Sequence, residues 1–169
     1  VGARSPISVK LVLRRLIEAL KEERYLDHLI LVDAVSSSLP RIEVNSDDLE
    51  EIFFNLIVNA AQAIGAGGQL IIEGSSQENP MPCVSIVFRD NGHGIPDDAL
   101  PHLFEPFCTG RVEKGGSGMG LYIVKELVKR NGGQIRVRSR RLLGTTFTVT
   151  FPAVPTSGPL PPVPNPSHP

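Results

Sequence analysis

Three amide side chains within residues 48–64 could contact a cation or a phosphate. Asn55, Asn59 and Gln62 follow one another at spacings of four and three residues. On a helix, this spacing places them in one stripe along the border of an apolar face. Asparagine gains little in a helix interior unless its amide has a partner. Because an amide oxygen can ligate a hard cation such as Mg²⁺, the stripe is a candidate cation and phosphate site. The alternative is an ordinary solvated face.

A carboxylate follows the strand-like residues 84–88, in the run Asp90-Asn91-Gly92-His93-Gly94-Ile95. A carboxylate at a strand end can accept a hydrogen bond from an exocyclic amine. The neighbouring glycines allow a flat ring to approach the backbone closely. The alternative is a tight turn, because Asn-Gly is a strong turn signal.

A second glycine-rich loop, residues 115–121, runs directly into a helical pattern. Consecutive N–H groups of the loop and of the helix N-terminus would suit a polyphosphate. The loop is not a Walker A motif, since Gly116 stands where that motif requires lysine. It is not a Rossmann fingerprint either, because no strand leads into it. A flexible linker remains the alternative, although linkers rarely run straight into an amphipathic helix.

The elements that must position these motifs alternate between helical and strand-like patterns. Apolar residues recur at helical spacing over residues 9–23. Ser46 or Asp47, with Asp47-x-x-Glu50 as a capping box, predicts the start of a helix that ends near residue 64. Together the pattern predicts an α/β sandwich, a mixed sheet with helices on one face. The further segments are strands at 28–35, 69–74, 83–89, 134–139 and 145–151, and a helix at 119–130.

Size and composition fit one soluble globular domain. The chain has 169 residues, of which 41% are hydrophobic, and a formal net charge of −1. No global field would therefore recruit nucleic acid or an anionic membrane, and no apolar run approaches the roughly 20 residues that span a bilayer. The two cysteines lack metal-ligand or disulfide spacing, which favours a reducing compartment. Eight of the fifteen prolines lie in the last eighteen residues, so 153–169 are expected to be a disordered tail or linker.

The motifs, in their order along the chain, resemble those of one family. Asn55-x-x-x-Asn59, Asp90-x-Gly92-x-Gly94, Phe104-Glu105-Pro106-Phe107 and Gly116-x-Gly118-x-Gly120 match its four boxes over about residues 36–152. The chain thus resembles the catalytic, ATP-binding domain of sensor histidine kinases. That domain belongs to the GHKL superfamily, with type II topoisomerases, mismatch-repair ATPases and a heat-shock chaperone. The resemblance implies a Bergerat-type fold, a two-layer sandwich with a mostly antiparallel sheet and a mobile ATP lid over roughly residues 107–117.

The resemblance also implies roles for single residues. Asn59 resembles the family's Mg²⁺ ligand, and Asn55 would be a second polar contact one turn earlier. Asp90 matches the carboxylate that recognises the adenine amino group, while Gly94 would let the backbone approach the base. Thr146 resembles a threonine that often supports the adenine site.

Other predicted site residues belong to the lid and its anchors. Arg111 stands where relatives often carry a lysine that faces phosphate. Gln62 replaces a basic residue of relatives, so phosphate affinity would depend more on Arg111 or Lys114. Phe104 and Phe107 match the box that anchors the lid. The catalytic candidates are Asn55, Asn59 and Arg111, with Asn59 the metal ligand. The residues assigned to Mg-ATP binding are Asn59, Gln62, Asp90, Gly92, Gly94, Ile95, Phe104, Phe107, Thr109, Lys114, Gly116, Ser117, Gly118, Met119, Gly120, Leu121 and Thr146.

Two absences bound the expected activity. Superfamily members that hydrolyse ATP usually place a glutamate base where Asn55 stands, and an amide cannot take a proton from water. None of the four histidines, His28, His93, His102 and His168, has the sequence context of a phosphoacceptor. The resemblance therefore implies a protein histidine kinase domain, which transfers the γ-phosphoryl group of ATP to a histidine in a separate helical domain.

The implied partners lie outside this chain. They are the helical dimerisation and phosphoacceptor domain of the parent protein and, downstream, the receiver domain of a response regulator. Residues 1–24 would be a helical linker or remnant of the former domain, and 25–152 the ATP-binding domain. We expect a homodimeric parent and a cytoplasmic location, with or without a membrane anchor, and no contact of this domain with nucleic acid or membrane. Two alternatives stay open: a catalytically silent nucleotide-sensing or docking module, and a GHKL ATPase, against which Asn55 argues.

Overall fold

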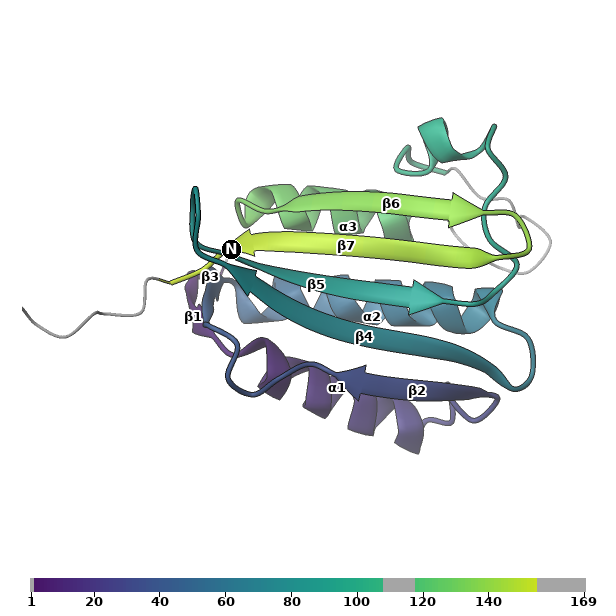
Figure 1. The fold of residues 1–169 in the computed structure, drawn as a ribbon, viewed down its shortest axis with the longest axis horizontal. Helices are drawn as coiled ribbons and strands as arrows, with labels where there is room; N and C mark the ends of the chain where they lie inside the picture. Colours follow the sequence, from purple (N-terminus) through teal and green to yellow (C-terminus); the bar gives the residue numbers. More distant parts are fainter. Residues whose placement is uncertain (1, 108–117, 155–169) are drawn as a thin grey trace, which may run out of the picture.

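The computed structural model describes residues 2–107 and 118–154, and its main feature is one twisted sheet (Figure 1). Strand β2 pairs in parallel with β4, and all the other neighbours are antiparallel. The predicted mixed, mostly antiparallel sheet is therefore confirmed. In spatial order, its strands are β2 (Leu29–Ala34), β4 (Gly68–Gln77), β5 (Cys83–Asp90), β7 (Gly144–Pro152) and β6 (Gln134–Arg140).

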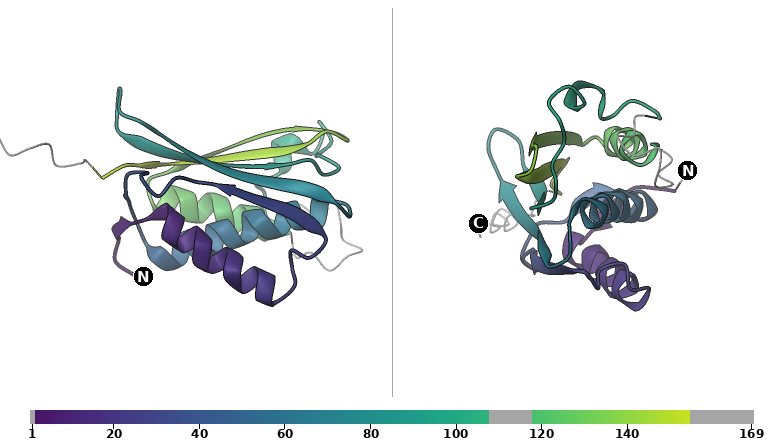
Figure 2. Two further views of the ribbon diagram at one scale, coloured as in Figure 1. Left: turned by 60° about the horizontal axis from the view of Figure 1, so that its bottom comes forward. Right: turned by 90° about the vertical axis from the view of Figure 1, so that its right-hand side faces the viewer.

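The α-helices of the described residues all lie on one face of this sheet, as Figure 2 shows in its left view. They are α1 (Val9–Glu22), α2 (Ser46–Ala63) and α3 (Gly120–Arg130). We call the sheet face that packs on them the inner face and the opposite one the outer face. This arrangement confirms the predicted two-layer sandwich.

Strand alternation sorts the side chains between the two faces. On β5, Val84, Ile86 and Phe88 are buried on the inner face. The ring of Phe88 lies 5.5 Å, centroid to centroid, from that of Phe53 on α2, so aromatic packing joins the two layers. Arg89, one residue beyond Phe88, is exposed on the outer face. The parity of a strand residue therefore decides which layer its side chain can reach.

Helix α2 begins one residue away from the predicted caps. Asn45 has an extended backbone, and its Oδ1 accepts a hydrogen bond from the N–H of Asp48 at 2.9 Å. Asparagine is among the best N-cap residues, since its side chain satisfies one of the unpaired N–H groups of the first turn. Ser46 and Asp47 are already helical, so the predicted cap and capping box were wrong.

Short elements escaped the sequence patterns. Strands β1 (Ser5–Ile7) and β3 (Ile42–Val44) form a separate antiparallel pair, and η1 (Leu100–His102) is a single 3₁₀ turn. Segments of three residues are too short to show a period. The apolar face of α1 joins the same core as α2 and the sheet. The boundary predicted at residue 24 stays a prediction.

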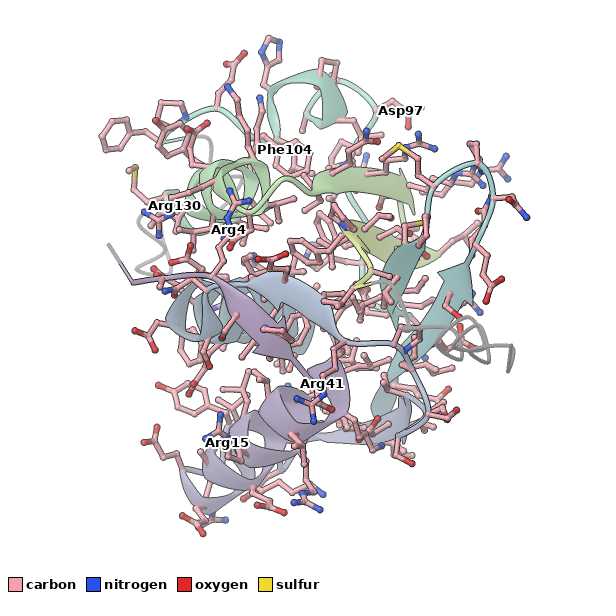
Figure 3. All side chains as sticks on the ribbon, turned by 90° about the vertical axis from the view of Figure 1, so that its left-hand side faces the viewer. Arg4, Arg15, Arg41, Asp97, Phe104 and Arg130 are labelled. Carbon is pink, nitrogen blue, oxygen red and sulfur yellow. The ribbon has the colours of Figure 1, made fainter. Side chains whose placement is uncertain are left out.

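A partly buried polar network, centred on the buried Asp48 and Asn131, joins the start of α2 to the end of α3. Arg130 donates from Nε to Oδ2 of Asp48 at 2.9 Å, and its Nη2 donates to Oδ1. Asn131 donates from Nδ2 to Oδ2 of Asp48 at 2.7 Å and accepts from the N–H of Asn45 at 2.8 Å. Arg4 donates to the carbonyl oxygen of Arg130, and Figure 3 shows these two arginines side by side. The network fixes this end of the helix layer.

Candidate functional site

Asp90 is the last residue of β5 and lies on its inner face, only 6% exposed. Its Oδ1 accepts hydrogen bonds from the N–H groups of Gly92, at 2.8 Å, and of Thr145, at 3.2 Å. Among the described residues no donor is bonded to Oδ2. One oxygen is thus held by the fold, and the other has room to accept a hydrogen bond from a ligand amine.

The surroundings of Asp90 disfavour its charge. Burial raises the pKa of this carboxyl above its usual range, while the hydrogen bonds from Gly92 and Thr145 and the nearby His93 act in the opposite direction. A carboxylate that gives up solvation in this way is typical of a functional site, although ion-pair networks produce shifts as well. Here the partners of Asp90 are backbone N–H groups, which point to recognition of a donor.

A hydroxyl network braces the strand that supports Asp90. Ser139 on β6 donates to the carbonyl oxygen of Gly144 at 2.9 Å and accepts from the N–H of Ile95 at 2.8 Å. Because its single hydrogen is then used, the Thr145 hydroxyl, 2.9 Å away, must donate to Ser139. Neither residue was among the sequence candidates. Thr145 shares its strand parity with the core residue Phe147, and this signal could have identified it.

Thr146, the threonine predicted to support the adenine site, does not lie there. It pairs across the sheet with Arg89, and strand alternation places its side chain on the outer face. Thr145, one residue earlier, contacts Asp90 from the inner face. Strand alternation therefore favours Thr145 over the predicted Thr146 as the threonine beside Asp90, because a shift of one residue on a strand changes the side of the sheet.

The loop after Asp90 packs against the C-terminal end of α2. His93 donates its backbone N–H to the carbonyl oxygen of Ala63 at 3.1 Å. A Cβ on Gly92 would lie 2.5 Å from the same oxygen, so only glycine fits at this distance. Gly94, at φ +68°, faces the backbone of Arg140. In this structure the close approach at Gly94 is made by the β6–β7 hairpin.

Asn59 lies one turn before Ala63 and has an unsatisfied amide. Its Nδ2 is buried and has no hydrogen-bond partner among the described residues. Leaving such a group unpaired costs about 1–3 kcal/mol, so native proteins keep one mainly where a ligand or ion can satisfy it. Since the amide can turn over to present its oxygen, Asn59 fits the predicted contact with a hydrated cation or a phosphate.

Asn55 lies one turn before Asn59 on α2, next to the start of α3. Asn55 donates from Nδ2 to the carbonyl oxygen of Glu51 at 2.9 Å. A Cβ on Gly120, the first residue of α3, would lie 2.8 Å from Oδ1 of Asn55. The N-terminus of α3, which is the positive end of the helix dipole, is therefore set beside Asn55.

Helix α2 thus connects two kinds of binding group. From Asn55 to Ala63 is eight residues, or about 12 Å along the axis. At one end stands a buried carboxylate with a free oxygen, and at the other a helix N-terminus that suits an anion. The spacing fits a ligand with an amine-bearing ring at one end and phosphates at the other.

The remaining predicted residues are distributed as follows. Phe104 packs against the core, whereas Phe107 is 77% exposed and has φ +62°, and the lid-anchoring role of both stays a prediction. Gln62 is exposed on α2. Ile95 and Leu121 also pack against the core. Gly118, Met119 and Gly120 lead into α3, while Thr109, Arg111, Lys114, Gly116 and Ser117 lie outside the described residues.

The described residues contain neither a cluster of metal-ligating side chains nor a membrane-spanning helix. No group of three His, Cys, Asp or Glu side chains there could hold a metal ion. Nor is any helix in this part of the chain long and apolar enough to cross a membrane.

Comparison with known proteins connects the geometry to a family. Residues 44–155 match the family model described as histidine kinase-, DNA gyrase B- and HSP90-like ATPase. The chain is 32% identical over 164 residues to the sensory histidine kinase/phosphatase NtrB of Rhizobium leguminosarum bv. phaseoli, which covers 89% of this chain and 42% of the relative. It is 37% identical over 117 residues to the sensor histidine kinase ZraS of Escherichia coli K12, covering 69% and 24%. The chain thus spans less than half of these relatives.

Solved structures show the same similarity. The mycobacterial sensor histidine kinase MprB matches with a TM-score of 0.73 and 26% identity, covering 90% of this chain and 99% of the MprB chain. Full-length ShkA in complex with AMPPNP matches with a TM-score of 0.77 and 27% identity, covering 95% of this chain and 33% of ShkA.

Proposed function

The chain belongs to the family of histidine kinase-, DNA gyrase B- and HSP90-like ATPases, and from this premise we propose that it is the ATP-binding catalytic domain of a two-component sensor histidine kinase. The proposal rests mainly on two polar groups near the same end of α2, the carboxylate of Asp90 and the side-chain amide of Asn59. A buried carboxylate and a buried amide nitrogen border the same end of α2, and within residues 2–107 and 118–154 neither Oδ2 of Asp90 nor Nδ2 of Asn59 has a hydrogen-bond partner.

Asp90 recognises the adenine ring in this proposal. Its Oδ2 accepts a hydrogen bond from the exocyclic amino group, while the N–H groups of Gly92 and Thr145 hold Oδ1 in place. Guanine carries an oxygen at the corresponding position, so a carboxylate discriminates against it. A binding group that is held before the ligand arrives loses less entropy on binding. ShkA, which was solved with AMPPNP, supports a nucleotide ligand of this kind.

The phosphates lie between α2 and the start of α3. Asn59 takes part in holding Mg²⁺, an ion that keeps most of its waters and takes its other ligands from phosphate. Asn55 and the N-terminal N–H groups of α3 hold the phosphate oxygens. We also assign Arg111 and Lys114, which lie outside the described residues, to contacts with phosphate. Bound Mg-ATP supplies the γ-phosphoryl group, and the residues of this chain orient it and offset its charge.

The proposed reaction is transfer rather than hydrolysis. Asn55 donates a hydrogen bond from Nδ2 to the carbonyl oxygen of Glu51, and its side chain has no basic atom that could activate water. The acceptor would be a histidine in the helical dimerisation domain of the parent, because a neutral imidazole nitrogen is nucleophilic near physiological pH. The NtrB and ZraS relatives are sensor histidine kinases of more than twice this length. We further propose that the parent protein is a cytoplasmic homodimer and that a response regulator receives the phosphoryl group downstream.

A catalytically silent nucleotide sensor is the second candidate. The replacement of a basic residue by Gln62, an exposed amide on α2, favours it. Such a module would bind ATP with the same preference but would support no phosphotransfer.

The test combines binding with transfer. Calorimetric titration of the chain with ATP and GTP, each with and without Mg²⁺, should show Mg²⁺-assisted binding of ATP over GTP. Incubation of the parent protein with γ-labelled ATP should then label a histidine, and the double variant Asp90→Asn, Asn59→Ala should abolish the label. Binding without labelled histidine would favour the sensor, and retention of the label in the double variant would refute the proposed site.

A further inference from the structure

A cavity of about 460 Å³ lies on the side of the sheet away from the helices. It spans the ends of four neighbouring strands, β4, β5, β7 and β6. Figure 1 looks onto this outer face, with the helices behind it. We call it the outer cavity, and its lining residues are Gln69, Ile71, Arg89, Asp90, Asn91, Arg138, Ser139, Arg140, Leu143, Gly144 and Thr146.

The outer cavity is distinct from the proposed nucleotide pocket. Ile71, Arg89, Thr146 and Arg138 are successive cross-strand neighbours. The first three alternate with buried inner-face residues, and Arg138 alternates with the half-buried Val137 and Ser139. Their side chains therefore point away from α2 and α3. Asp90 reaches the rim of the cavity, but its carboxylate is turned to the N–H groups of Gly92 and Thr145.

The lining of the outer cavity is strongly basic. Three arginines, Arg89, Arg138 and Arg140, contribute to it. Arg89 forms an ion pair with Glu73 at 3.3 Å, with both side chains about half exposed. Within the described residues, no carboxylate lies at ion-pair distance from Arg138 or Arg140. The cavity thus has cationic groups in excess of its acids.

The register sets these groups around one hydroxyl. Thr146 pairs with Arg89 on β5 and with Arg138 on β6, so it lies between them. With strands about 4.8 Å apart, the two arginine Cα atoms are about 10 Å from each other. Arg140 follows two residues after Arg138 on the same side of β6, about 7 Å along the strand. An anion above Thr146 would meet guanidinium groups from both sides.

The cavity also has an apolar wall. Ile71 lies beside Arg89 in the ladder, and Leu143, 69% exposed, closes the end near the β6–β7 hairpin. Because the Leu143 side chain is mostly exposed, it is available to contact an apolar part of a ligand. A cavity of this volume lies within the range of about 300–1,000 Å³ typical of small-molecule sites.

We propose that the outer cavity binds a phosphate ester. Its phosphate lies over Thr146, between Arg89 and Arg138, and its organic part lies against Ile71 and Leu143. The planar fork of the guanidinium group matches phosphate oxygens two at a time, which a lysine could not do. The site stands apart from ATP binding, which the preceding proposal assigns to the inner face.

Phenyl phosphate is a suitable probe, since it has both a phosphate and an apolar ring. Titration into the ¹⁵N-labelled chain, followed by NMR, should shift the amide signals of Thr146 and Arg138. Arg138→Ala should weaken binding about tenfold, the effect of losing one charge-assisted hydrogen-bonding pair. Arg136→Ala is the matched control: Arg136 is exposed on the same face of β6 but does not line the cavity, so its loss should change the affinity less than twofold.

Two further experiments distinguish this site from the nucleotide pocket and identify the source of the phosphate ester. Asn59→Ala should leave phenyl phosphate binding unchanged, whatever it does to ATP. Absence of binding, equal effects of Arg136→Ala and Arg138→Ala, or signal shifts confined to Asn59 and Gly92 would each overturn the proposal. Vesicles of phosphatidylcholine with phosphatidylglycerol test a lipid source: co-sedimentation that Arg138→Ala abolishes assigns the site to a headgroup, and its absence, with phenyl phosphate bound, to a soluble ester.

Discussion

The backbone N–H of Thr145 donates a hydrogen bond to Oδ1 of Asp90 at 3.2 Å. The two residues are also register partners at the ends of β7 and β5. The carboxylate is therefore positioned by the pairing of two central strands. Such a group is in place before a ligand arrives, whereas a carboxylate on a loop would have to be ordered on binding.

Asp90→Asn should reduce ATP affinity strongly and leave the fold intact. The asparagine oxygen can still accept from Gly92 and Thr145, but the amide nitrogen that replaces Oδ2 cannot accept from an amine. We expect a loss of about 10- to 100-fold in calorimetric titration with Mg-ATP. Thr146→Val is the control, because its side chain lies on the outer face. A comparable loss in this control would show that the strand parity argument fails.

The same substitution should change how stability depends on pH. Burial raises the pKa of Asp90, so the folded state binds this proton more tightly than the unfolded chain. The resulting stabilisation is complete below the unfolded pKa, about 3.9, and is lost as the pH rises through the folded pKa. Asp90→Asn should therefore gain stability relative to wild type between pH 4 and pH 7 in urea unfolding. A constant difference across this range would contradict the assignment.

Asn59→Ala should separate stability from function. The substitution removes a buried amide nitrogen that has no partner among the described residues, and this relief opposes the cost of the small cavity it leaves. We expect an unfolding free energy within about 1 kcal/mol of wild type. Mg-ATP affinity should fall at least tenfold, and the dependence of binding on Mg²⁺ should weaken. A large loss of stability with unchanged affinity would make Asn59 a structural residue.

The sequence predicted the layers well because their period is visible residue by residue. The apolar residues of α2 recur with helical spacing, and β5 is a short apolar run followed by turn residues, so a helix and a strand were predicted in these places. Asn59 and Asp90 stood out because each is a polar residue next to a buried run. The local pattern alone left a solvated face and a tight turn open, and the family resemblance supplied the predicted roles of these two residues.

Contacts between distant segments could not be predicted in this way. Asn45 caps α2 in competition with Ser46 and Asp47, and all three are good cap residues. Thr145 and Thr146 are identical in type, and only the register with β5 shows which one meets Asp90. Ser139 acquires its role through partners on the Asp90 loop and β7. In each case the choice is made by tertiary pairing.

Gly94→Ala should be severely destabilising. Gly94 has φ +68°, and a Cβ there would lie 2.0 Å from the carbonyl oxygen of Arg140, an overlap that a backbone atom cannot relieve. We expect a loss of about 3 kcal/mol or more in urea unfolding. Gly67→Ala is the matched control: φ is +77°, but its Cβ would meet open space. It should lose only the conformational cost, about 1–2 kcal/mol. Equal losses would show that the contact with the hairpin does not constrain the loop.

Asp48→Asn should weaken the polar network between the start of α2 and the end of α3. It should also change how the free energy of unfolding declines at acidic pH. Burial alone would raise the pKa of Asp48, but hydrogen bonds from Arg130 and Asn131 outweigh it and hold the pKa below its usual range. The stabilisation is therefore present above the unfolded pKa, about 3.9, and is lost as the pH falls through the folded pKa. The variant should lose about 1–3 kcal/mol at pH 7 and show a flatter decline in acid. The control is Asp27→Asn, which removes the exposed ion pair with Arg24 and should change little because solvent screens that pair. Parallel acid limbs in wild type and Asp48→Asn would mean that another carboxylate governs the transition.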